Sequence, residues 1–443
     1  MRKVSARNLQ WLEKELPILE REGILAADAV RGIRSYYREN TGGGLHWATL
    51  AFAVLGSLLI GAGIILLFAH NWDELDRPTR AVLSFCPVAI GAILSVLALV
   101  RHGGVARRES AGIFHSLAVG SSIALIGQTY HIPGNVPGFL LSWSLLILPL
   151  AFLLGSTGAF LIYLGLICGW SGVAQDHYGQ AAAFWLLLAP ALVKVWAMVR
   201  VDRNAPDTLL SVYGILFTLA ISTGIVFERT VPGLWIVAYS ALLSAAALLG
   251  LNLYRDREGW SNPPKTFGII GIALLAYLFT WSDMWRDIGW QWTRNGWHYR
   301  TWGTWADATI ALALLAGWIA AAIQSFRRNS IETITLAAFP AIATLCFFIG
   351  AASGDQSNGI NAVIFNAFLL FYGVLYIVLG CRNTKLRQLN GGMAILSLLL
   401  VTRFFDDDFG FLARGIVFIA LGACFLTVNL IMARRKKTLE AAS

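Results

Sequence analysis

Ionisable and amide side chains gather where long apolar runs end, and their types could support chemistry. Three histidines each have acidic or amide neighbours: His70 with Asp73 and Glu74, His131 with Gln128, and His177 with Asp176. Imidazole and carboxylate groups can ligate zinc, or form part of a proton or cation pathway. The same groups also serve as ordinary polar caps where a helix leaves a membrane. The sequence leaves these alternatives open.

A second cluster lies in the segment TRFFDDDFGFLAR at 402–414 and combines both signs of charge. Its charged members are Arg403, Asp406, Asp407, Asp408 and Arg414. The spacing permits charge pairing, which lowers the cost of an arginine at a membrane helix end. The cluster is either a structural clamp on the last helical hairpin or the polar lining of an outward-facing cavity. Together the two groups predict a polar rim on the outer side.

Motifs of soluble enzymes are missing from the sequence. It contains no phosphate-binding loop, no GxSxG turn, no HExxH and no cysteine–histidine zinc spacing. The sequence therefore assigns no catalytic residue and predicts no cofactor, and it leaves metal binding undetermined.

Apolar runs form the elements that must position these groups. Residues are 57% hydrophobic and 13% charged, where a soluble domain has roughly 25% charged residues. A run of about 20 apolar residues crosses a bilayer as a helix. About fourteen runs are expected to do so: 47–69, 79–100, 111–129, 138–154, 158–175, 181–199, 208–226, 233–254, 266–284, 306–323, 331–351, 360–380, 389–404 and 411–432. The fold class is an all-α, polytopic helical bundle in the lipid bilayer.

The distribution of basic residues predicts how the chain is oriented in the membrane. Most of the 34 lysines and arginines fall in alternate connections, beginning with the N-terminal segment and ending with the tail at 434–437. Cytosolic loops carry this excess, so both termini are expected in the cytosol. The same distribution explains the net charge of +9 without a nucleic-acid partner.

The segments outside the bilayer are small. Residues 1–45 predict a cytosolic helical hairpin with a glycine linker, with Pro17 interrupting its first helix and Gly23 marking its turn. Residues 46–432 form the membrane domain and 433–443 a basic tail. The hairpin either lies against the membrane surface and the helix ends or docks a protein partner.

Several segments resemble a bacterial family of predicted membrane proteins classed as a domain of unknown function. They are WLEKELPILEREGIL and RSYYREN in the hairpin, GAGIILLFAHNWDELDRPTR around the first two spans, GQTYHIPGN at 127–135, and TRFFDDDFGFLARG near the end. The resemblance implies many spans and the inner membrane of a bacterium. It supplies no catalytic residues.

For function, the sequence favours a transport-like or permeation role for a small solute or ion, because little protein lies outside the bilayer and polar groups collect at span ends. One alternative is a membrane enzyme acting on a lipid-linked or glycan substrate, with the tryptophan-rich stretch 281–305 beside its site. Another is a sensor or assembly scaffold working through the hairpin.

Overall fold

The computed structural model describes residues 6–39, 75–101, 104–178, 181–230, 233–285, 302–326, 330–353 and 358–404, with residues 419, 422 and 426. Within these residues every regular element is a helix and no strand occurs, as expected. The chain divides into two compact units, Met1–Arg80 and Ala81–Ser443.

The first unit contains the expected hairpin. Helices α1 (Ala6–Arg21) and α2 (Ala27–Glu39) contact each other, and Leu16 and Val30 are buried at 2% and 3% exposure. Gly23 has φ +74°, a left-handed conformation that glycine adopts without steric cost, and it marks the turn as predicted. However, α1 continues through Pro17, because the bonds that follow it, such as Glu22 N–H to Ile18 O at 3.0 Å, extend the helix beyond the proline.

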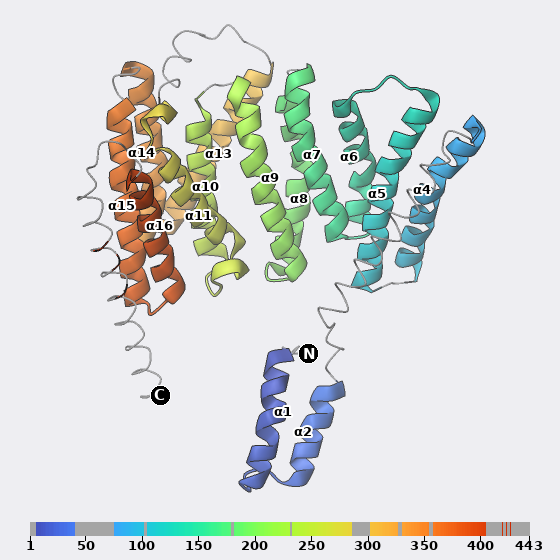
Figure 1. Cartoon of the computed structure of the whole chain (residues 1–443), viewed down its shortest axis with the longest axis horizontal. Helices are drawn as coiled ribbons and strands as arrows, with labels where there is room; N and C mark the ends of the chain where they lie inside the picture. Colours follow the sequence, from blue (N-terminus) through green and yellow to red (C-terminus); the bar gives the residue numbers. More distant parts are fainter. Residues whose placement is uncertain are drawn as a thin grey trace. The chain divides into compact units, whose positions relative to one another are not determined.

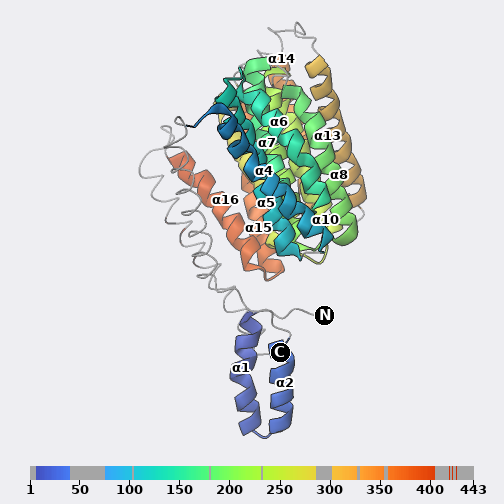
Figure 2. The same ribbon diagram turned by 90° about the vertical axis from the view of Figure 1, so that its right-hand side faces the viewer.

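The second unit is a bundle whose successive helices run side by side, from α4 and α5 at one edge to α15 and α16 at the other (Figure 1). The turned view again places α15 beside α16 (Figure 2). Its α-helices are α4 (Arg77–Val100), α5 (Val105–Tyr130), α6 (Val136–Leu153), α7 (Thr157–Tyr178), α8 (Phe184–Asp202), α9 (Pro206–Thr230), α10 (Trp235–Leu253), α11 (Pro263–Leu278), α13 (Trp302–Phe326), α14 (Ile331–Ser353), α15 (Asn358–Arg382) and α16 (Leu386–Phe404). Short 3-10 turns are η2 (Ala181–Ala183), η3 (Gly259–Ser261) and η4 (Ser282–Trp285).

Ten helices of the described residues are long and apolar enough to span a membrane, and α11 and α16 are shorter apolar helices. The protein is therefore an integral, multi-pass membrane protein. The expected first span, 47–69, lies outside the described residues, and the last, 411–432, has only residues 419, 422 and 426 among them. The expected helix at 266–284 ends at Leu278, because Trp285 folds back and its Nε1 donates to Phe279 O at 2.9 Å.

Helix α10 lies at the centre of the second unit. In an apolar 18-residue stretch of α10, 67% of the residues are buried, whereas 22% are buried in the corresponding stretch of α4. Two main clusters of buried side chains flank it, one drawn from α5 to α10 and the other from α10 to α16. Large apolar side chains on the outer faces stay exposed, including Val82 at 64% and Val100 at 71%. Such an exposed apolar surface is what a helix presents to lipid.

Small residues let the helices approach closely. A Cβ added to Gly268 on α11 would lie 2.4 Å from Leu243 O and 2.5 Å from Ala247 N, both backbone atoms of α10. On α15 and α16, a Cβ at Gly392 would lie 2.6 Å from Gly373 O. These contacts are possible only without a side chain.

Substitution of glycine by alanine should therefore have opposite effects at two positions. Gly268→Ala forces α10 and α11 apart and should cost roughly 1–3 kcal/mol of stability. Gly317→Ala on α13 meets nothing within 4 Å and should be neutral or stabilise by about 0.5–1 kcal/mol. Thermal unfolding of both variants in detergent measures the difference. Equal melting temperatures would show that the close approach of α10 and α11 is not needed.

Candidate functional site

A cavity of about 1130 Å³ lies between α4, α5 and α6. Its walls are mostly apolar, with Phe85 and Val88 on α4, Ile123 on α5, and Phe139 and Leu146 on α6. Its volume is at the upper end of, or above, the roughly 300–1,000 Å³ typical of small-molecule sites. It is the best-formed candidate site in the part of the chain that the structure describes.

The connection between α5 and α6 shapes one end of the cavity, at the upper side of the bundle in Figure 1. His131 ends α5 in the left-handed region at φ 51°, and Ile132 N–H donates to Gly127 O at 3.0 Å. Asn135 then begins α6, since its Oδ1 accepts from Gly138 N at 2.8 Å. The turn and the cap together place residues 132–136 along the cavity.

His115 lies nearer the start of α5 and is the one titratable side chain among the described residues that line the cavity. Its Nδ1 is 3.1 Å from Ser95 Oγ on α4. Gly91 permits this approach, since a Cβ there would lie 2.9 Å from His115 Cα. The Ser95 contact leaves Nε2 as the ring nitrogen for a ligand.

For most of the predicted rim residues, the structure does not describe where the side chain lies relative to this cavity. Gln128 and His131 are exposed and adjoin it in sequence, but their neighbours Gly127 and Ile132 line it instead. The backbones of Asp176 and His177 are in α7, and that of Arg403 is in α16, but their side chains lie outside what is described. Outside the described residues altogether lie His70, Asp73, Glu74, Asp406, Asp407, Asp408 and Arg414.

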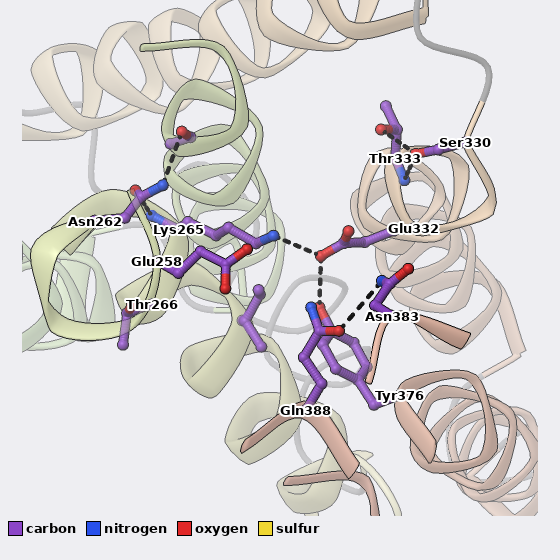
Figure 3. Close-up of polar contacts among 12 residues, drawn as sticks. Glu258, Asn262, Lys265, Thr266, Ser330, Glu332, Thr333, Tyr376, Asn383 and Gln388 are labelled. Atoms are coloured by element: carbon purple, nitrogen blue, oxygen red, sulfur yellow. Dashed lines mark hydrogen bonds and ion pairs between the residues drawn. The ribbon is translucent and has the colours of Figure 1, made fainter. Parts of the chain in front are cut away.

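A second polar cluster joins side chains of α11, α14 and α15 (Figure 3). Lys265 Nζ lies 3.0 Å from Glu332 Oε1, and the two side chains are 19% and 16% exposed. Tyr376 OH donates to the same oxygen at 3.4 Å. Lys265 is in the first turn of α11, where the helix dipole disfavours a cation. Glu332, in the first turn of α14, supplies the opposite charge.

The loop before α11 is held by Asn262, whose Nδ2 donates to Gly250 O at 3.0 Å and to Tyr254 O at 3.2 Å. Its Oδ1 accepts from Lys265 N at 3.2 Å and so caps α11. Burial raises the pKa of Tyr254, against the opposing effect of Arg203. The loop thus fixes the start of the helix that carries Lys265.

Two further charged side chains, of which Lys194 is buried and Glu109 is partly exposed, lie beside the turn between α6 and α7. Lys194 is 8% exposed, and its Nζ donates to Ala151 O at 2.9 Å. Glu109 accepts from Thr157 N at 2.7 Å and from Gly158 N at 2.9 Å. Both carboxylate and ammonium therefore satisfy helix ends, which gives them a structural role.

Asp307 on α13 is fully buried, and one of its contacts is Trp185 Nε1, which donates to its Oδ1 at 2.8 Å. Among the described residues, no three His, Cys, Asp or Glu side chains lie close enough to hold a metal ion. The zinc alternative thus gains no support there.

Sequence reasoning did not select His115, Lys265, Glu332 or Asp307. Each lies inside or at the edge of an apolar run. The only feature of the sequence that could have pointed to any of them was a single polar residue within such a run. The GQTYHIPGN segment was recognised, but its place beside a cavity depends on how α4 packs against α5 and α6.

A comparison with protein families shows that part of this chain resembles a known family. Residues 18–160 match the family "Predicted membrane protein (DUF2157)". The resemblance expected from the sequence is confirmed over that stretch. No curated protein and no solved structure matches the chain. Every residue that lines the cavity lies within the DUF2157 match, whereas Lys265, Glu332 and Tyr376 lie beyond it.

The Lys265–Glu332 pair should contribute more to stability than a solvent-exposed pair. Lys265→Met leaves a mostly buried carboxylate without its partner and should cost roughly 1–3 kcal/mol. The double variant Lys265→Met, Glu332→Leu should recover much of this loss, because no charge then stays unpaired.

The matched control is the pair Lys385–Glu258, whose side chains are 39% and 60% exposed. Lys385→Met should cost about 0–1 kcal/mol. Melting temperatures of all four proteins in one detergent test the comparison. A double variant less stable than Lys265→Met would contradict the charge argument.

Proposed function

We propose that this protein has a transport-like role and moves a small solute or ion into or across the membrane through the α4–α5–α6 cavity. The supporting observation is the cavity itself, of about 1130 Å³ and built from three candidate membrane spans. A channel or carrier needs such a space within its spans, and an ionisable residue that faces the space is a natural candidate for binding the solute. His115 lines the cavity and is such a residue.

The orientation proposed from charge extends this hypothesis. With about fourteen spans and both termini in the cytosol of a bacterium, the α5–α6 connection faces outward and the Lys265–Glu332 end faces the cytosol. The predicted outer rim, which includes Gln128 and His131, then surrounds the entrance of the cavity. A solute would enter past this rim and meet His115 near mid-membrane.

The two alternatives have less support. An enzyme acting on a glycan would place two carboxylates in one pocket, and the described residues that line this cavity include no carboxylate. A scaffold would work through the hairpin, where Ile18 and Ile24 are 47% and 63% exposed. Those two side chains are a small apolar surface for a protein partner, and deleting residues 1–45 would test that role.

Blocking the cavity should abolish permeation. In proteoliposomes, we expect the protein to accelerate shrink–swell relaxation in at least one of glycerol, erythritol and potassium chloride. Ile123→Trp should remove that acceleration, because Ile123 lines the cavity. Leu117→Trp is the control on the same helix, since Leu117 is 50% exposed and does not line the cavity. The proposal would be contradicted if the protein accelerated relaxation in none of the three solutes, or if both variants lost the acceleration equally.

Topology can be measured separately. Single cysteines at Gly104 and Gly134, introduced after replacing the native cysteines, should react from opposite sides of the membrane. We expect an impermeant maleimide to label position 134 in intact bacterial cells and position 104 only after the membrane is opened. Labelling of both from outside would overturn the proposed orientation.

A further inference from the structure

The cavity between α4, α5 and α6 opens on the side of the bundle. Four of its lining side chains are more than half exposed: Phe85 at 56%, Ile132 at 57%, Val136 at 55% and Leu146 at 58%. They lie on α4, on α6 and on the connection before α6. These helices face lipid in a membrane, so a molecule dissolved in the bilayer can reach the cavity without crossing water.

The lining also restricts the charge of a ligand. Among the described residues that line it there is no Asp, Glu, Lys or Arg. A charged group moved into such a space loses its hydration without gaining a counter-charge, which costs several kcal/mol. The walls therefore favour an apolar chain, and any polar group on the ligand must be uncharged.

Hydrogen-bonding groups are few and separated along the cavity. At 1.5 Å per residue, His115 lies about 18 Å along α5 from Gly127. Ser122 Oγ already donates to Ser84 O at 2.6 Å, and Asn135 Oδ1 already caps α6. His115, whose Nδ1 contacts Ser95, keeps Nε2 for a ligand. Ser142 on α6 also lines the cavity, and its hydroxyl is a second, weaker contact for a polar group. The lining therefore suits a ligand that is long and mostly apolar, with its hydrogen-bonding group at the imidazole.

We propose that the cavity binds a membrane-dissolved amphiphile: a long apolar chain with one uncharged hydrogen-bonding group that contacts His115. The chain packs against Phe85, Ile123 and Leu146, and the ligand enters sideways from the bilayer. This inference concerns the same cavity as the proposed function and goes beyond it, because the ligand comes from the bilayer and is not a small solute or ion.

The probes are three hexadecyl compounds with the same diazirine in the chain, which differ only in the head: an alcohol, a sulfate and a trimethylammonium. The full-length protein in lipid nanodiscs is irradiated with each probe, and the labelled residues are mapped by mass spectrometry. The alcohol should label residues lining the cavity, and unlabelled hexadecanol should compete. The two charged probes should label these residues on the order of tenfold less, as a penalty of 1.4 kcal/mol or more implies.

Variants separate this site from general contact with lipid. Ile123→Trp and Leu146→Trp fill the cavity from opposite walls and should each reduce labelling on the order of tenfold. Leu117→Trp should leave it unchanged. His115→Phe keeps the ring volume but removes the hydrogen bond, and should reduce labelling by the alcohol roughly five- to tenfold. Size-exclusion profiles that match the unmodified protein identify variants that fold.

Three outcomes overturn the inference: alcohol labelling spread evenly over lipid-facing side chains, equal labelling by the sulfate or trimethylammonium probe, and no effect of either cavity-filling variant. A labelled cavity in a protein that accelerates no solute flux supports the ligand class but refutes the transport proposal. Flux that Ile123→Trp removes, without cavity labelling, refutes the ligand class and supports transport.

Discussion

Charges in this protein are placed where a helix end or an opposite charge compensates them, and the bundle depends on that constraint. The α6–α7 turn shows it most directly. Lys194 donates to a carbonyl in the last turn of α6, and Glu109 accepts from the first N–H groups of α7. A helix end carries partial charge that water cannot neutralise inside a bilayer. Side chains from α8 and α5 do so instead, and they join these two helices to the turn between α6 and α7.

The same constraint explains the Lys265–Glu332 contact. A cation in the first turn of α11 is opposed by the helix dipole, so Lys265 requires a carboxylate from another helix. Glu332 meets this need from the start of α14, where the dipole favours it. Tyr376 on α15 donates to the same carboxylate, so side chains from three helices meet at one compensated charge. Their ends are thereby kept in register.

Much of the fold could be predicted from the sequence, because apolar length determines a membrane helix. The run 79–100 became α4, and the break at 155–157 became the turn between α6 and α7. Helix ends were less predictable: α5 begins at Val105, before the apolar run, because a helix can continue through Arg107 and Arg108 at its end. The site was harder still. A hydropathy pattern records which residues are apolar, but it does not record where three helices leave a space between them.

The described lining of the cavity is uncharged, which differs from other parts of the bundle. Elsewhere the protein tolerates Lys194 and Asp307 inside candidate spans, each with a defined hydrogen-bond partner, so the bundle can accommodate buried charge where geometry provides compensation. The described lining of the α4–α5–α6 cavity provides one histidine and the uncharged polar residues Ser122, Asn135 and Ser142, and its other side chains are apolar. A protein that places charge in its spans, but has none on the described residues lining this cavity, has walls there that fit the uncharged, apolar ligand proposed above.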